Sequence, residues 1–234
     1  MAADTQPLAA NLNTPAGRSN SLTRSVYEQL RAELLSGHYR PGEKLPAEEL
    51  RQRFQMGSSP IREALNRLLA EGFVSLEDQK GFRVAPVSLE DLEELVQARR
   101  LVDGEAVIQS IRRGDTAWEE GLVLALHRLS RVQRRVGDDL VGDNPDWERL
   151  HRAFHMALVS GCGSRWLCRI SEQLFDNAER YRQLVSRDLS ERNELEEHQA
   201  ITRACLEGRA DDAVALLGEH YGRTSRMIAE SLNV

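Results

Sequence analysis

The sequence predicts a mainly α protein in which an N-terminal winged helix-turn-helix is followed by an all-α helical bundle. Residues 45–84 contain two helical patterns at turn spacing and then two short β-prone runs. No strand-like alternation of apolar and polar residues appears after that point. A chain of 234 residues is long for one core, so we expect two domains, residues 21–87 and 88–234, after a flexible N-terminal tail at residues 1–20.

The two helices of the predicted motif are separated by a three-residue turn, residues 55–57. Leu50 and Phe54 lie four residues apart on the first helix, and apolar residues recur at three-to-four spacing from Ile61 to Leu69 on the second. Two serines and a proline at residues 58–60 suit the first turn of the second helix, because hydroxyls cap free amides and proline is tolerated there. The start of this helix is therefore expected to be exposed.

Two β-prone runs, residues 73–76 and 82–85, are joined by residues 77–81 and predict a hairpin, or wing. In helix-turn-helix proteins the second helix enters the major groove by its N-terminal residues, while other contacts position the protein on phosphates. The base-contact candidates are Ser58, Ser59 and Arg62; the candidates for the DNA backbone are Arg67 and, in the wing, Lys80, Gly81 and Arg83. The alternative is a small helical hairpin with a purely structural role.

This segment resembles the DNA-binding domain of GntR-family bacterial regulators. The resemblance runs from VYEQLRAELLSGHYRPGEKLPAEEL through SSPIREALNRLLAEGFV to KGFRV, and PIREAL is its most distinctive tract. The family usually carries a serine-arginine pair where this chain has Gly57 and Ser58. The resemblance therefore implies that an arginine reaching a guanine is missing, and that the operator sequence differs from those of relatives.

Charge and composition limit the classes of protein to which this chain can belong. Residues 21–87 carry ten Lys and Arg against nine Asp and Glu, whereas residues 88–234 carry twenty against twenty-seven. Phosphate binding needs clustered positive charge rather than net charge, so this balance predicts modest non-specific affinity for DNA. No apolar run approaches the ~20 residues that span a bilayer, and the N-terminus lacks the features of a signal peptide. We expect a cytoplasmic protein with no membrane partner, whose three cysteines are reduced.

From residue 88 onward the pattern predicts helices near 88–113, 115–136, 146–160, 164–187, 189–207 and 210–231. The first begins with a capping box, in which Ser88 precedes Asp91 by three residues. Helical bundles build their ligand sites from side chains that project inward. The polar residues on the apolar faces are therefore the candidates.

Four of the six histidines lie on such faces. His151 and His155 are one turn apart, and this i, i+4 spacing allows two histidines of one helix to bind the same metal ion. His198 precedes the turn between the last two helices by ten residues and His220 follows it by ten, so both are expected ~15 Å from that turn. Neutral imidazole favours Zn²⁺, Ni²⁺, Co²⁺ or Cu²⁺, and we expect Zn²⁺ or Ni²⁺. The alternative for any single histidine is a hydrogen-bonded core residue.

The second half resembles the FadR C-terminal (FCD) ligand-binding domain, the effector domain of one GntR subfamily. The tracts ERLHRAFHMALVSGCGS and EEHQAITRACLEGRADDAVALLGEHYG carry this resemblance. Metal-binding members use one aspartate and three histidines, and His151 stands at the aspartate position. A neutral nitrogen there lowers the negative charge of the site, which favours later transition metals.

Arg99 is a further inward polar candidate, because it follows Leu92 by seven residues and Val96 by three on one helix. A buried guanidinium needs a carboxylate partner or an anionic ligand. Asp103, four residues on, is the candidate partner in a structural salt bridge. In relatives the arginine of the matching R-x-x-x-D/E helix lies near the effector pocket, so the resemblance implies that Arg99 and Asp103 are effector-binding and that Arg99 and the metal together hold a small carboxylate.

Together the resemblances imply a ligand-responsive transcriptional regulator, and the commoner behaviour in the family is that of a repressor relieved by its effector. Its expected partners are a near-palindromic DNA operator, a small organic acid and a second copy of the chain. One alternative is a regulator for which the metal itself is the signal. Another is a metal-dependent hydrolase, which is disfavoured because Arg152 follows His151 where a HExxH enzyme has its glutamate base.

Overall fold

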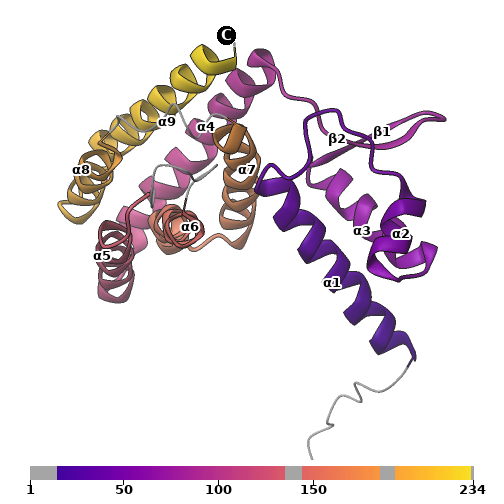
Figure 1. Cartoon of the computed structure of the whole chain (residues 1–234). Helices are drawn as coiled ribbons and strands as arrows, with labels where there is room; N and C mark the ends of the chain where they lie inside the picture. The colour runs from indigo at the N-terminus through magenta and orange to yellow at the C-terminus, as the bar shows by residue number, and fades with distance from the viewer. Residues whose placement is uncertain (1–14, 135–143, 185–192, 233–234) are drawn as a thin grey trace, which may run out of the picture. The chain divides into compact units, whose positions relative to one another are not determined.

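The computed structural model describes residues 15–134, 144–184 and 193–232 of the chain (Figure 1). The chain forms two compact units whose main boundary lies between Pro86 and Val87. We call them the N-terminal unit and the helical unit and describe each by itself. The mainly α fold class is confirmed, since every regular element of the described residues is helical apart from one hairpin in the N-terminal unit.

The N-terminal unit contains α1 (Pro15–Leu35), α2 (Ala47–Phe54), α3 (Ser58–Ala70), β1 (Val74–Glu77) and β2 (Gly81–Val84). The start of α1 corrects the predicted tail, because residues 15–20 are helical and only residues 1–14 lie outside the described part. Proline suits the first position of a helix, where its missing N–H would lack an intrahelical partner anyway. The core of this unit includes Leu30, Leu45, Ile61, Leu65, Leu68 and Phe73.

The turn between α2 and α3 falls at the predicted residues. Gln55 ends α2 in the left-handed conformation (φ 52°), and its N–H is directed to the carbonyl oxygens of Arg51 and Gln52. The predicted hydroxyl cap of α3 is wrong: Gly57 is the N-cap residue and no side chain caps the helix. Ser59 instead donates from its hydroxyl to Glu63, at 3.1 Å. The first-turn amides of α3 are therefore not occupied by a capping side chain.

The wing is a two-stranded antiparallel sheet in which Val74 pairs with Val84 and Leu76 with Phe82. It turns tightly, with Gln79 (φ 62°) and Gly81 (φ 83°) both in the left-handed region. Strand β1 lies one residue later than the predicted run 73–76, and β2 lies one residue earlier than 82–85. Phe73, just before β1, is buried in the core, and the N–H of Ala85, just after β2, donates to the carbonyl oxygen of Phe73.

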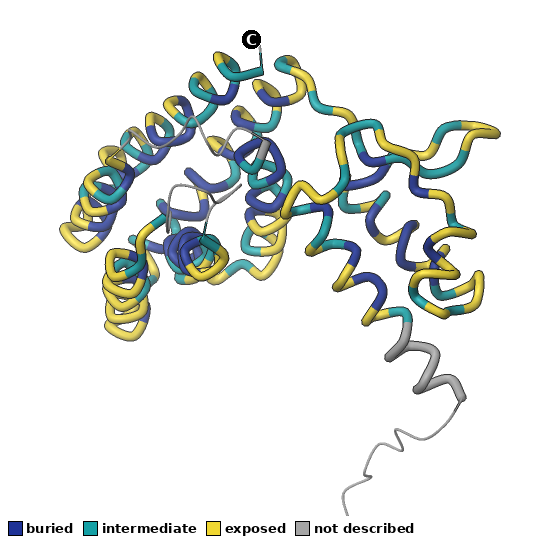
Figure 2. The backbone as a smooth tube through the Cα atoms, viewed as in Figure 1, coloured by how far each residue is buried: buried dark blue, intermediate teal, exposed yellow. Residues whose placement is uncertain are grey.

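The helical unit contains α4 (Leu89–Arg113), α5 (Thr116–Ser130), α6 (Pro145–Val159), the 3₁₀ turn η1 (Ser160–Cys162), α7 (Arg165–Leu184), α8 (Glu194–Leu206) and α9 (Ala210–Leu232). Helix α4 packs against α6, α7 and α9, while α5 packs against α6 and α8. Figure 2 shows the buried stripe of each helix turned towards its neighbours. The core includes Val107, Leu122, Phe154, Leu158, Ile201 and Leu217.

Side-chain caps define several helix starts in this unit. Ser88 accepts from the Asp91 N–H at 3.0 Å, as predicted, and Asn144 and Asn193 cap α6 and α8. Two predicted helix bounds are wrong, since α5 ends at Ser130 rather than residue 136 and α8 begins at Glu194 rather than residue 189. The side-chain oxygen of Asn193 caps the first turn of α8 and so fixes where this helix begins. Of the residues predicted to be helical, 135–136, 185–187 and 189–192 lie outside the described part of the chain.

Two further observations concern the whole described part. None of its helices is both long enough and apolar enough to cross a membrane. The three cysteines are free, with Cys162 and Cys205 buried and Cys168 partly exposed.

Candidate metal centre and nucleic-acid interface

Four histidines from three helices meet inside the helical unit. His151 and His155 come from α6, His198 from α8 and His220 from α9, and all four side chains are buried. One ring nitrogen from each lies within 4.8 Å of those of the other three. The positions predicted from the sequence therefore converge on one point.

Helix geometry explains this convergence. The i, i+4 spacing on α6 places the Nε2 atoms of His151 and His155 3.1 Å apart. The α8–α9 turn, with Gly208 at φ 72°, brings the rings of His198 and His220 to a centroid distance of 4.8 Å. Two nitrogens bound to one tetrahedral zinc ion at 2.0–2.1 Å are about 3.3 Å apart. The α6 pair is thus already spaced for one ion.

Burial keeps the α6 histidines neutral. It lowers the pKa of His151 and of His155 well below the usual value, and neighbouring histidines and arginines lower both further. Within the described residues, the Nδ1 atoms of His151 and His155 have no hydrogen-bond partner. Neutral imidazole is the form that binds a metal, so no proton has to leave these two rings before an ion enters.

Glu197 on α8 orients the α9 histidine. Its Oε2 lies 2.8 Å from Nδ1 of His220, and Arg223 donates to its other oxygen at 3.2 Å. A carboxylate on one ring nitrogen directs the opposite nitrogen towards a metal and raises its basicity. The sequence reasoning missed Glu197. The only feature of the sequence that pointed to Glu197 is that it directly precedes His198, and neighbouring residues lie on different faces of a helix.

The wall behind His151 is aromatic and cationic. The indole of Trp147 stacks on the His151 ring at 4.5 Å and 14°. The guanidinium carbons of Arg182 and Arg134 lie 4.8 and 5.0 Å from the same indole. Such contacts are favourable when desolvated, and they hold His151 in one orientation. Neither arginine was singled out from the sequence, because the patterning does not reveal contacts between helices.

Arg99 and Asp103 occupy the inner face of α4. Arg99 is 8% exposed, and its guanidinium lies 3.6 Å from Asp103 and stacks 3.8 Å from the ring of Tyr221. The Tyr221 hydroxyl donates to Asp103 at 2.7 Å, and burial raises its pKa well above the usual value, so it stays protonated. The structural salt bridge considered above is therefore formed. Within the described part, Nε of Arg99 and Oδ1 of Asp103 nevertheless have no hydrogen-bond partner.

A small cavity joins Arg99 to the histidines. Its volume is about 30 Å³, and its lining includes Arg99, His151, His155, Arg182, Tyr221 and Thr224. One water needs about 10–15 Å³ in this measure, so the cavity accepts only a few atoms. Two carboxylates also line it, and each pairs with an arginine, Glu179 with Arg182 and Glu194 with Arg134.

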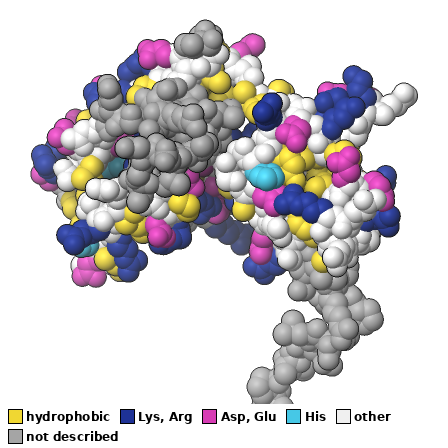
Figure 3. All heavy atoms as spheres, in the orientation of Figure 1, with side chains coloured by type: hydrophobic (Ala, Val, Ile, Leu, Met, Phe, Trp, Pro, Cys, Tyr) yellow, Lys and Arg dark blue, Asp and Glu magenta, His cyan; other side chains and the backbone are white. Residues whose placement is uncertain are grey.

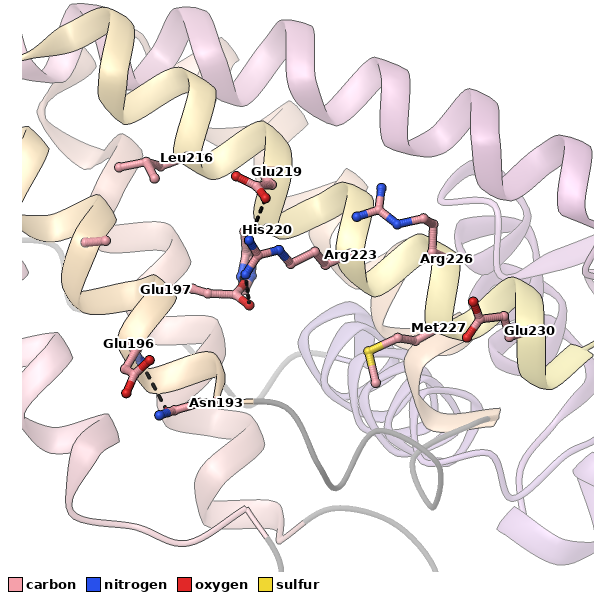
Figure 4. A pocket seen from close by; sticks show the side chains of 11 residues that line it. Asn193, Glu196, Glu197, Leu216, Glu219, His220, Arg223, Arg226, Met227 and Glu230 are labelled. Carbon is pink, nitrogen blue, oxygen red and sulfur yellow. Dashed lines mark hydrogen bonds and ion pairs between the residues drawn. The ribbon is translucent and has the colours of Figure 1, made fainter.

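A larger groove of about 530 Å³ lies between α8 and α9 (Figure 4). Its lining mixes acidic and basic side chains, among them Glu196, Glu219, Arg226 and Glu230. His220 and Glu197 form part of its wall, whereas the other three histidines do not line it. The groove therefore reaches the outer side of the histidine cluster and not its centre.

In the N-terminal unit, Ser58, Ser59 and Arg62 are exposed at the start of α3, where the sequence placed the base contacts. Lys80 and Gly81 lie at the wing turn, and Lys80 is exposed. Figure 3 shows basic and acidic side chains together on the visible face of each unit. This mixture agrees with the near-neutral charge of residues 21–87.

Two of the predicted phosphate contacts already have partners within the unit. Arg67 stacks 3.6 Å from the Tyr27 ring and lies 3.2 Å from Glu71. Arg83 donates to the carbonyl of Gly42 at 3.0 Å and pairs with Glu77 at 3.1 Å. Arg83 thus holds the base of the wing, and only part of its guanidinium is left for another ligand.

Comparison with known proteins defines the class. Residues 22–84 match the family described as bacterial regulatory proteins, gntR family, and residues 94–223 match the FCD domain. The chain belongs to the GntR family of bacterial transcriptional regulators and carries an FCD domain, as its resemblances implied. The family and its relatives are regulators, so the prediction that the protein is not an enzyme is confirmed.

Particular relatives support this membership. The chain is 36% identical over 207 residues to the HTH-type transcriptional regulator BphR of Paraburkholderia xenovorans, covering 88% of this chain and 84% of that protein. It is 34% identical to the transcriptional repressor GlaR of Escherichia coli, covering 83% and 90%. The structure of E. coli McbR/YncC superposes with a TM-score of 0.75 at 22% identity, covering 90% and 98%, and this similarity shows the shared fold.

Proposed function

We propose that this regulator is a homodimeric repressor whose operator binding is controlled by a small carboxylate, bound beside a transition metal in the helical unit. The observation that carries the proposal is the cluster of four buried histidines, whose ligand nitrogens lie within 4.8 Å of one another and share a cavity wall with Arg99. A regulator needs no such cluster to hold its fold, because the core around it is already apolar.

The donor set favours Zn²⁺ or Ni²⁺. All four donors are neutral nitrogens, which suit later transition metals and not Mg²⁺ or Ca²⁺. Glu197 would not contact the ion, but its negative charge would act on it through the hydrogen bond to Nδ1 of His220. The residues His151, His155, His198 and His220 would hold the ion, and the ion would supply an electrophilic point for an anionic ligand.

The charge around the cavity selects an anion. A bound divalent ion adds two positive charges to a wall that already carries Arg99 and Arg182, against the paired carboxylates Glu179 and Glu194. A carboxylate head group would satisfy both the ion and Nε of Arg99, which faces Asp103 at 3.6 Å but makes no hydrogen bond among the described residues. The cavity is too small for the rest of an organic acid, so the part of the acid beyond the carboxylate would displace neighbouring side chains. That displacement is the event that the regulator would detect.

On the DNA side, Ser58, Ser59 and Arg62 of each copy would meet base edges. Arg67, Lys80, Gly81 and Arg83 would meet the backbone of one half-site. The repressor role rests on analogy with GlaR, which is named as a transcriptional repressor.

The test is the metal content of the purified protein after dialysis against Zn²⁺ or Ni²⁺, measured by elemental analysis. We expect about one ion per chain, lost when all four histidines are replaced by alanine and retained in the control His38→Ala/His127→Ala, which alters the other two. Thermal-shift screening of short carboxylic acids with the loaded protein then tests the effector. A protein that takes up no metal would overturn the proposal.

A second candidate is a regulator for which the metal is the signal. The observation in its favour is the histidine at position 151, because a neutral donor in place of a carboxylate weakens electrostatic attraction for the ion and makes its binding more reversible. Titrating metal into the protein and its operator DNA separates the two. A change of operator affinity with metal alone favours this candidate, and a change that also needs a carboxylate favours the first.

A further inference from the structure

Two of the three cysteines lie side by side, away from the histidine cluster. Cys162 is the last residue of η1, Cys168 lies in the first turn of α7, and their Sγ atoms are 3.6 Å apart. Cys162 is buried, whereas Cys168 is partly exposed. Neither residue lines the cavity beside Arg99 or the groove between α8 and α9. The two thiols are therefore in contact at a place that the proposed function does not use.

The local path of the chain explains why these sulfurs meet. Gly163, directly after Cys162, takes the left-handed conformation (φ 71°) and turns the chain into α7. The hydroxyl of Ser164 accepts from the N–H of Leu167 at 3.3 Å, and its carbonyl oxygen accepts from the N–H of Cys168 at 3.1 Å. The first turn of α7 is fixed in this way, so one glycine reverses the chain between the two cysteines.

The other contacts of the two thiols are weak. The S–H of Cys168 donates to the carbonyl oxygen of Val159, the last residue of α6, at 3.6 Å. The S–H of Cys162 donates to the carbonyl oxygen of Ser164 at 3.5 Å. Thiols are poor hydrogen-bond donors, so the loss of both hydrogens would cost little. Arg113, at the end of α4, donates to the carbonyl oxygen of Cys162 at 3.3 Å, and a change at the sulfur leaves that bond in place.

We propose that Cys162 and Cys168 form a reversible disulfide, which joins η1 covalently to α7 when the small thiols around the protein become oxidised. A disulfide bond is about 2.05 Å long, so the two sulfurs have to approach by about 1.5 Å. Gly163 lies between them and permits the small backbone adjustment that this approach needs. The pair is reduced in the structure, as expected of a protein in a reducing compartment.

The oxidant is a small-molecule disulfide such as glutathione disulfide. The thiolate of Cys168, the more accessible of the two, attacks one sulfur of the oxidant, which releases one small thiol and leaves a mixed disulfide. The sulfur of Cys162 then attacks that of Cys168, the mixed bond breaks and the second small thiol leaves. The protein loses two electrons and two protons, and the two sulfurs of the oxidant gain them.

Burial makes this exchange slow. It raises the pKa of Cys168 to about 11, and the contact with the Cys162 thiol adds to the rise. Few chains therefore hold the attacking thiolate near pH 7. Reduction begins at the same partly buried sulfur and is also hindered, because an outside thiol reaches it only in part. We expect a bond that forms slowly under sustained oxidation and persists after the oxidant has gone.

The disulfide would act on the helix that carries the proposed effector contact. Both η1 and α7 pack against α4, whose inner face holds Arg99. Drawing η1 and α7 together changes the packing of α4, so the oxidised protein should differ from the reduced one at least about threefold in the carboxylate concentration that gives half the thermal shift. This step rests on the proposed function, whereas the disulfide itself does not.

Equilibration of the full chain with glutathione buffers of graded redox ratio tests the disulfide. Trypsin cleaves after Arg165, so the bond would join peptides 153–165 and 166–169, which mass spectrometry identifies after alkylation of the remaining thiols. The glutathione ratio at which half of the chains carry the bond gives the effective concentration of one thiol beside the other. We expect it to be at least about tenfold higher in the folded chain than in guanidinium, because the fold holds the sulfurs in contact.

Cys205 supplies the internal control. It is buried on α8, and burial raises its pKa to about 12, so it should remain a free thiol and be alkylated in every buffer. The variant Cys205→Ser should give the same effective concentration as the wild type, and Cys162→Ser should give no linked peptide. An effective concentration in the folded chain no higher than in guanidinium would overturn the proposal, as would glutathione attached to Cys168 without a linked peptide.

The outcomes separate this proposal from the proposed function. A linked peptide with an unchanged carboxylate response supports the disulfide and overturns its effect on the effector site. A chain that binds no metal but still forms the linked peptide overturns the metal site alone, because the two cysteines lie outside the histidine cluster. Metal binding without a linked peptide overturns the disulfide and leaves the proposed function standing.

Discussion

Replacing Glu197 by glutamine should weaken metal binding without disturbing the fold. The carboxylate accepts from Nδ1 of His220 at 2.8 Å and is mostly buried. Glutamine can still accept that hydrogen bond through its carbonyl, but it lacks the charge that makes the opposite nitrogen a stronger donor to the ion. Loss of such an outer contact typically costs 10- to 100-fold in metal affinity, which is about 1.4 to 2.7 kcal/mol of binding free energy.

The assay is competition for Zn²⁺ against a chromophoric chelator of known affinity. The matched control is Glu196→Gln, one residue earlier, where the same change of charge occurs on an exposed side chain outside the histidine cluster. Thermal unfolding in chelator should give similar midpoints for both variants and the wild type. An unchanged zinc affinity in Glu197→Gln, or an equal loss in Glu196→Gln, would refute the argument that the carboxylate acts through His220.

Three further predictions follow from the same geometry. The metal-free protein should lose stability as pH falls below about 6.5, by up to about 1.4 kcal/mol per pH unit for each of His151 and His155. Both have a pKa in the folded protein that is below the unfolded value, so only the unfolded chain takes up protons in this range. Calorimetry in chelator checks this, and replacing both histidines by leucine should flatten the pH dependence of the free energy of unfolding. Tyr221→Phe removes the hydroxyl that holds Asp103, so it should raise the carboxylate concentration needed for half the thermal shift by about 3- to 30-fold, leaving metal content intact; an unchanged midpoint counts against the proposed pocket. Arg62→Ala should reduce operator affinity about 10- to 100-fold in fluorescence anisotropy while non-specific binding changes less, and equal losses on both DNAs would mean that Arg62 contacts only phosphate.

The elements of the N-terminal unit were predictable because the signals are local. Periodicity over a few residues defines α2 and α3, and the glycine at position 81 marks the wing turn. The cap of α3 was not, because either serine could accept from a first-turn amide. Whether either serine does so depends on where the backbone turns, and neither does, because α3 begins at Ser58 and its N-cap residue is Gly57.

The histidine cluster was predictable to the level of the residues. Constant helical rise places His198 and His220 at equal heights on either side of a short turn, and the i, i+4 rule joins His151 to His155. The surroundings were not predictable in the same way. Glu197 reaches His220 across the α8–α9 contact, and its role depends on a side-chain rotamer that no sequence spacing specifies.

The arrangement of the four histidines also bears on when the protein could first hold metal. The α6 pair is synthesised about 65 residues before His220, and a ribosome adds roughly 5–20 residues each second. Two imidazoles one turn apart would thus wait several seconds for the donors that complete the site. A chain that stops before α9 would carry three of the four donors, His151, His155 and His198, and would lack His220. A site with all four nitrogens would therefore exist only in a chain that includes α9, and Glu197, made before His220, would be in place to orient the last donor as it arrives.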